Sequence, residues 1–157
     1  MKNKGITYRM AYRDEWKEAM GLAWKVFMKF DAPDYSDKGI ESFREFVEDN
    51  GLYRMFIVGS YQLFVAIDGD RIIGILSLRN ETHISLLFVD EEYQRRGVAS
   101  DLIEVAGDYV MRELGGQFLT VNASPYGVVF YHNRGFRDLG DEEETDGIRY
   151  TPMVLYL

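Results

Sequence analysis

A short basic turn in the middle of the chain joins an apolar strand to an amphipathic helix. The turn reads Gln94-Arg95-Arg96-Gly97-Val98-Ala99, with Ser100 after it. The first N–H groups of a helix have no partners within the helix, and the helix dipole adds partial positive charge there. Small residues leave the main chain open to a ligand, and the two arginines add charge. The segment therefore predicts a site for an anion such as a diphosphate, although close helix packing would use the same small residues.

Strand and helix patterns alternate around this turn. Alternating apolar residues predict strands at residues 6–10, 61–67, 71–78, 82–89, 117–121 and 149–157. Apolar residues three and four positions apart predict helices at residues 14–30, 36–50, 98–114 and 125–134. Asp14 and Ser36 are expected N-caps, and Asn50-Gly51 is expected to end the second helix. Residues 68–70 predict a hairpin turn, whereas the acidic residues 141–144 are expected to form a solvated loop.

The composition excludes several classes of function. A length of 157 residues fits a single domain over residues 1–157. The chain has no cysteine, which excludes disulfides, a thiolate-rich metal site and a cysteine nucleophile, and we expect no metal. A formal net charge of -8 disfavours nucleic acid as a partner and suits a cationic one. Neither a signal peptide nor an apolar run of ~20 residues is present, so we expect a cytoplasmic protein without a membrane partner.

Two motifs resemble the signatures of the GNAT superfamily of N-acetyltransferases. The run from Gln94 to Ala99, with Gly97 between them, is similar to the acetyl-coenzyme A motif of that family, although Ala99 replaces the commoner last glycine. Asn122, and then Tyr131 with a Gly-Phe pair four residues beyond, resemble the later signature. The element order also matches along nearly the whole chain. The resemblance implies an α/β (α+β) fold, in which helices flank a mixed, mostly antiparallel central sheet.

The resemblance also implies acetyl-coenzyme A as the cosubstrate and an amine as the acceptor. The phosphates would bind the main chain of residues 94–100. The pantetheine arm would pair with Leu87, Phe88 and Val89, where the neighbouring strand splays away. A free N–H near Leu87 would polarise the thioester carbonyl. Asn122 would hold a pantetheine amide or a water molecule.

The catalytic roles are also expectations from the resemblance. Tyr131 is the expected general acid, because a phenol with a pKa near ~10 is protonated at neutral pH and can donate to a thiolate. His83 is the expected general base, because strand alternation would place His83, Ser85 and Leu87 on one face. Glu81 is the reserve candidate for the base, and a water molecule is the remaining alternative.

Other functions stay open at this point. A GNAT fold can serve as an acyl-coenzyme A sensor or non-catalytic module, and the donor or acceptor can differ, as with a longer acyl chain or a protein N-terminus. A nucleotide-binding Rossmann unit is disfavoured, because residues 97–99 lack the G-x-G-x-x-G pattern. The motifs do not identify the small-molecule or peptide amine. The resemblance implies pairing through late strands, so together with the apolar run at residues 153–157 it predicts a homodimer, unless this run is an internal strand.

Overall fold

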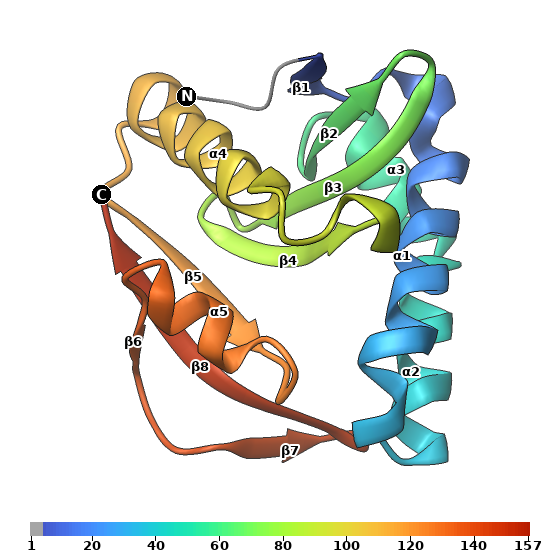
Figure 1. The fold of residues 1–157 in the computed structure, drawn as a ribbon, viewed down its shortest axis with the longest axis vertical. Coiled ribbons are helices and arrows are strands. Elements are labelled where there is room, and N and C mark those ends of the chain that lie inside the picture. Colours follow the sequence, from blue (N-terminus) through green and yellow to red (C-terminus); the bar gives the residue numbers. More distant parts are fainter. Residues whose placement is uncertain (1–4) are drawn as a thin grey trace.

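The computed structural model describes residues 5–157, and an eight-stranded, mostly antiparallel sheet forms its centre (Figure 1). The strands are β1 (Ile6–Met10), β2 (Gln62–Asp68), β3 (Arg71–Arg79), β4 (His83–Val89), β5 (Phe118–Ala123), β6 (Arg137–Asp138), β7 (Glu143–Thr145) and β8 (Ile148–Tyr156). They lie in the order β1-β2-β3-β4-β5-β8-β6, and β7 pairs with β8. β4 and β5 run parallel, whereas the other pairs are antiparallel. The expected mixed sheet is confirmed.

Helices cover both faces of this sheet. They are α1 (Trp16–Phe30), α2 (Asp37–Val47), α3 (Asn50–Ile57), α4 (Val98–Leu114) and α5 (Val128–Asn133). The first three pack on one face, here called the α1 face, over a core that includes Phe27 and Phe43. α4 and α5 cover the opposite α4 face, over a core that includes Leu102 and Met153. No helix within residues 5–157 is both long and apolar enough to cross a membrane.

The parallel strands β4 and β5 pair at two positions and then separate. His83 pairs with Thr120, and Ile84 pairs with Val121. Beyond these positions β4 continues along β3, while β5 continues along β8. The two strands diverge toward their C-terminal ends (Figure 1). The rest of β4, up to Val89, therefore has no strand partner on the side of β5, and this edge faces the opening between the two strands.

A β-bulge at Ser85 reverses the direction of the side chains along β4. The register of β3 against β4 slips by one residue there, with Ser85 as the extra residue. Ile84 and Leu86 consequently lie in the cores of opposite faces, although regular alternation would place both on one face. Leu87 packs on the α4 face, as Ile84 does, whereas neighbouring His83 points to the α1 face. The expectation that His83 and Leu87 share a face is therefore wrong.

The expected end of the second helix at Asn50-Gly51 is also wrong. The carboxylate of Asp49 accepts a 2.7 Å hydrogen bond from the N–H of Gly51, so Asp49 is the N-cap of a new helix, α3. The same chemistry confirms Ser36 as the N-cap of α2, where its hydroxyl accepts from the N–H of Gly39 at 3.1 Å. An Asp-Asn-Gly run therefore began a helix here instead of ending one.

The expected N-cap at Asp14 is wrong for a different reason. One 3₁₀ turn, Arg13–Glu15, precedes α1. Glu15 reaches back and accepts a hydrogen bond of 2.6 Å from the N–H of Tyr12. Arg9 forms an ion pair of 2.8 Å with the same carboxylate. Glu15, and not Asp14, therefore stands at the N-cap position of α1, although its side chain makes no capping hydrogen bond to that helix.

The last third of the chain forms more strand than expected. Of the acidic residues 141–144, the last two belong to β7, which forms an exposed hairpin with β8, so the loop assignment is wrong there. β8 itself lies between β5 and β6, and its residues Met153 and Val154 are buried. An internal strand therefore accounts for the apolar run at residues 153–157. The homodimer stays a prediction.

Candidate active site

The turn before α4 has a backbone geometry that glycine makes accessible. Gly97 is the N-cap of α4 and has a φ of 83°, in the left-handed region that favours glycine. Arg95 also has a positive φ, of 62°. The side-chain amide of Gln94 donates a 3.0 Å hydrogen bond to the carbonyl of Val89. The turn is thereby fastened to the end of β4.

A groove of about 740 Å³, here called the turn groove, connects this turn with the opening between β4 and β5. The expected cofactor residues that line it are Leu87, Phe88, Val89, Gln94, Arg95, Gly97, Val98, Ala99, Ser100 and Tyr131. Two others lie elsewhere. The guanidinium of Arg96 sits 4.8 Å from the ring centre of Tyr93, and Asn122 lines a second cavity. The structure brings most of the expected set together on one groove.

Arg134 is a cation of this groove that the sequence analysis missed. Its Nη1 donates a 3.0 Å hydrogen bond to Ser100 Oγ, and the residue lines the turn groove. The available signal was its position directly before Gly135 in the later family motif. Guanidinium groups match the oxygen atoms of phosphate well. With Arg95, the groove carries two cations in a chain of net charge -8.

The main chain of β4 presents hydrogen-bonding groups to the opening. The N–H of Asp90 donates to the carbonyl of Ile73 at 2.8 Å. Hydrogen-bonded and non-hydrogen-bonded pairs alternate along an antiparallel ladder, so Leu87 and Val89 occupy non-hydrogen-bonded positions opposite β3. Their N–H and C=O groups therefore point away from β3, toward the side from which β5 has departed.

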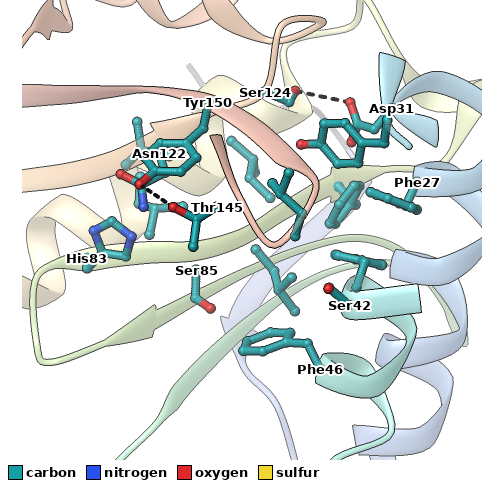
Figure 2. A pocket seen from close by; sticks show the side chains of 18 of the residues that line it. Phe27, Asp31, Ser42, Phe46, His83, Ser85, Asn122, Ser124, Thr145 and Tyr150 are labelled. Atoms are coloured by element: carbon teal, nitrogen blue, oxygen red, sulfur yellow. Dashed lines mark hydrogen bonds between the residues drawn. The ribbon is translucent and has the colours of Figure 1, made fainter. Parts of the chain in front are cut away.

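A second cavity of about 500 Å³, here called the aromatic cavity, lies on the α1 face beneath the β7–β8 hairpin (Figure 2). The rings of Phe27 and Phe43 stack at 3.9 Å, and Phe88 meets Phe43 edge-on at 5.7 Å. Polar and charged side chains complete the lining: Ser42, Arg79, His83, Asn122, Thr145, Asp146 and Tyr150. Aromatic faces attract cations, so such walls suit a ligand with an ammonium group.

The turn groove and the aromatic cavity meet at a set of residues that line both. They are Asp31, Leu87, Phe88, Ser124 and Tyr131, and we call this set the junction. It draws on α1, β4, the end of β5 and α5. A molecule in the groove and another in the cavity would come into contact here.

Tyr131 lies at the junction with its ring held on two sides. The rings of Phe130 and Phe136 lie edge-on to it, at 5.2 and 5.1 Å. The side chain is 7% exposed. Burial, assisted by the negative charge of Asp31, raises the pKa of Tyr131 above its usual value. The phenol is therefore protonated at neutral pH and can donate a proton or a hydrogen bond.

Asp31 is the junction residue that the sequence analysis missed. It follows α1 directly and is 8% exposed, and Ser124 Oγ donates a 3.1 Å hydrogen bond to its Oδ1 (Figure 2). Burial raises the pKa of Asp31 to about 6, although the bond from Ser124 opposes the rise; the nearby charge of Asp34 adds to it. An aspartate after an amphipathic helix is typical of a solvated helix end, so no pattern in the sequence marks it.

The two expected bases lie away from the junction. His83 lines the aromatic cavity, where its Nδ1 is 2.8 Å from Thr120 Oγ1. Burial, with a contribution from Arg79, lowers the pKa of His83 to about 4, so the ring is neutral at neutral pH. Figure 2 shows His83 beside Asn122, on the side of the cavity opposite Asp31. Glu81 is exposed in the turn after β3 and lines neither cavity.

A comparison with protein families identifies the class to which this fold and site belong. The model of the "Acetyltransferase (GNAT) domain" matches residues 31–157. That range includes the turn before α4, the opening between β4 and β5, and all five junction residues. The chain belongs to the GNAT family of acetyltransferases.

Individual proteins agree with this assignment. An uncharacterized N-acetyltransferase of Escherichia coli (strain K12), YafP, is 41% identical over 95 residues, which are 60% of this chain and 59% of that protein. A GCN5-related N-acetyltransferase from Rhodopseudomonas palustris superposes with a TM-score of 0.84 at 22% identity, over 100% of this chain and 99% of that one. The PaiA N-acetyltransferase from Thermoplasma acidophilum, in complex with coenzyme A, superposes with a TM-score of 0.76 at 19% identity, over 97% of this chain and 99% of that one. The two structures show the same fold.

Proposed function

We propose that this chain transfers an acetyl group from acetyl-coenzyme A directly to an amine. The observation that carries the proposal is the junction, where a groove suited to the cofactor meets a cavity suited to an amine. A thioester at that point would lie beside the main chain of Leu87 and the hydroxyl of Tyr131. A donor for the carbonyl and an acid for the thiolate would both be at hand there.

The turn groove is the proposed site of the cofactor. The phosphates would accept hydrogen bonds from the first N–H groups of α4, with Arg95 and Arg134 supplying charge. The pantetheine arm would lie along β4 and pair with the main-chain groups of Leu87 and Val89, which point away from β3. The coenzyme A complex of the PaiA neighbour, which has this fold, supports the assignment.

The transfer itself needs a donor for the carbonyl, an acid for the thiolate and an acceptor for the amine proton. The N–H of Leu87 would donate to the thioester oxygen and stabilise the negative charge that develops as the amine attacks, an effect of ~2.7–4 kcal/mol for one well-placed donor. Tyr131 would protonate the departing thiolate. Asn122, on the wall of the aromatic cavity, is proposed to hold a water molecule or an amide. His83, which the sequence favoured as the base that takes the amine proton through water, lines the aromatic cavity away from the junction.

The acceptor would occupy the aromatic cavity. Its walls are stacked phenylalanine rings, and its charged lining residues are Asp31, Asp146, which pairs with Lys38, and one cation, Arg79. Aromatic faces and carboxylates both favour a cation, and amines are cationic at neutral pH. The cavity volume of about 500 Å³ suits a small amine or the end of a peptide chain.

A screen of amines with acetyl-coenzyme A, followed by free thiol release and by the mass of the acetylated product, tests the proposal. We expect amine-dependent thiol release with at least one class of small cationic amine. Calorimetric binding of acetyl-coenzyme A without thiol release by any amine would favour the sensor function instead. Absence of both binding and turnover would contradict the proposal entirely.

A further inference from the structure

We infer that Asp31 receives the ammonium group of the acceptor and removes the proton that blocks its attack on the thioester. The inference rests on the proposed function and assigns the proton acceptor within that site. It differs from the sequence-based expectation, which gave this role to His83.

The position of Asp31 is the first reason. Asp31 lines both the turn groove and the aromatic cavity, and its side chain is the one carboxylate within the junction. His83 lines the aromatic cavity alone and lies across it from Asp31 (Figure 2). The amine nitrogen must touch the thioester carbon, so its proton acceptor belongs at the junction.

The surroundings of the carboxylate are the second reason. Asp31 caps the C-terminal end of α1, where the helix dipole is negative and disfavours a second negative charge. The groups that face it are the hydroxyl of Ser124, the phenols of Tyr35 and Tyr131, and the like charge of Asp34. None of these is a cation. Arg149 of β8, whose charge acts on the phenol of Tyr35, donates a 3.1 Å hydrogen bond to the carbonyl of Asp34 and forms its ion pair with Glu142. An incoming ammonium group would supply the missing counter-charge at the place where the reaction occurs.

These surroundings also suit proton removal. A buried carboxylate with a pKa raised to about 6 is a stronger base than an ordinary aspartate, yet it is still ionised at neutral pH. Burial lowers the pKa of His83 to about 4, which makes its imidazole the weaker base of the two. The geometry and the acid–base balance therefore favour the same residue.

The proton balance of the transfer closes with Asp31 and Tyr131. The ammonium group gives one proton to the Asp31 carboxylate, and the free amine nitrogen forms a bond to the thioester carbon. The C–S bond breaks, and the thiolate takes the phenolic proton of Tyr131. The nitrogen still carries one proton too many, and this proton restores the phenol. Asp31 releases its proton to solvent, so the products are the amide, the free thiol and one proton.

The test is the pH dependence of kcat/KM for the amine in wild type and Asp31→Asn, with acetyl-coenzyme A saturating. Wild type should rise to a plateau with an apparent pKa near 6, since Asp31 must be ionised to accept the proton. The variant should be about 10²–10⁴-fold slower at pH 7.5, as is usual for the loss of a general base. Its rate should climb toward the pKa of the amine itself, because only amine that arrives deprotonated would react.

Two neighbouring substitutions make the assignment sharper. Ser124→Ala removes the hydrogen bond that lowers the pKa of Asp31. The rise of kcat/KM with pH, here called the acid limb, should therefore move to higher pH. Asp34→Asn removes a charge that raises this pKa, so the limb should move to lower pH. A carboxylate with a merely structural role would produce neither shift.

The outcomes separate the inference from the proposed function. Wild-type turnover with an unchanged rate and pH profile in Asp31→Asn would overturn the role of Asp31 while the acetyltransferase stands. An acid limb that disappears in His83→Gln and persists in Asp31→Asn would return the role to His83. Acetyl-coenzyme A affinity, measured by calorimetry, should match wild type in Asp31→Asn if the protein is folded. Absence of turnover in wild type would instead contradict the proposed function.

Discussion

Gly39 in α2 packs against the main chain of Gly147 in the turn between β7 and β8, so closely that a Cβ on Gly39 would overlap the carbonyl group of Gly147. Ser42 Oγ also donates a 3.1 Å hydrogen bond to the carbonyl of Asp146, next to this contact. Gly39 and Ser42 thus join α2 to the β7–β8 hairpin and hold one wall of the aromatic cavity in place.

Gly39→Ala should therefore weaken acceptor binding. The added methyl group pushes the hairpin outward, at a cost of about 1–3 kcal/mol for overpacking, against a helix-propensity gain of up to ~1 kcal/mol. We expect a raised KM for the amine and an unchanged affinity for acetyl-coenzyme A. Gly21→Ala is the matched control, because Gly21 is also helical and an added Cβ meets nothing within 4 Å. An unchanged KM in Gly39→Ala would show that the hairpin does not shape the cavity.

Gly97→Val should abolish acetyl-coenzyme A binding. Valine is strained at a φ of 83°, and Gly97 lines the turn groove, where the cofactor is proposed to bind. Gly59→Val is the matched control, since Gly59 has the same φ of 83° and open space around it, and it lies outside the groove. Calorimetry should find wild-type affinity in the control and none in Gly97→Val. Equal affinity in the two variants would contradict the cofactor site at the start of α4.

Tyr131→Phe should keep acetyl-coenzyme A affinity and lower kcat and kcat/KM together by about 10²–10⁴-fold. The ring remains packed between Phe130 and Phe136, and the hydroxyl alone is lost. Tyr109→Phe is a control, because Tyr109 packs against Phe64 and lines neither cavity. A change in KM alone would mean that the hydroxyl positions a substrate, and unchanged kinetics would leave water as the acid.

Asp31→Asn should be more stable than wild type at pH 7.5. The pKa of Asp31 is about 6 in the fold, against ~3.9 for an unfolded aspartate. Between these values the folded state holds a proton that the unfolded state has lost, so the free energy of unfolding falls as pH rises through this window and stays lower above it. The neutral variant avoids this loss, which amounts to about 1–3 kcal/mol. Urea unfolding should show the difference at pH 7.5 and little of it at pH 3.5, and a less stable variant at pH 7.5 would refute the assignment.

The elements and the turn groove were largely predictable, because they depend on local patterns. The run from Gln94 to Ala99 has the residues that a helix-start anion site needs, and the structure forms a groove at that position. The helix boundaries failed where local chemistry was ambiguous. Asn50-Gly51 can end a helix, yet the carboxylate of Asp49 turned it into the start of α3.

The junction could not be predicted, because it depends on contacts between distant segments. Asp31 and Ser124 are 93 positions apart and meet only when α1 packs beside the end of β5. The bulge at Ser85 arises from a register slip between two strands, and alternation along one strand cannot reveal it. It placed Leu87 and His83 on opposite faces, so the expectation of one face shared by His83, Ser85 and Leu87 failed.

The initial-rate pattern with both substrates varied tests direct transfer at the junction most directly. If the amine attacks acetyl-coenzyme A while both are bound, double-reciprocal plots at several amine concentrations should intersect. Parallel lines, together with an acetyl group recovered on the protein after incubation with acetyl-coenzyme A alone, would contradict direct transfer and require a covalent intermediate.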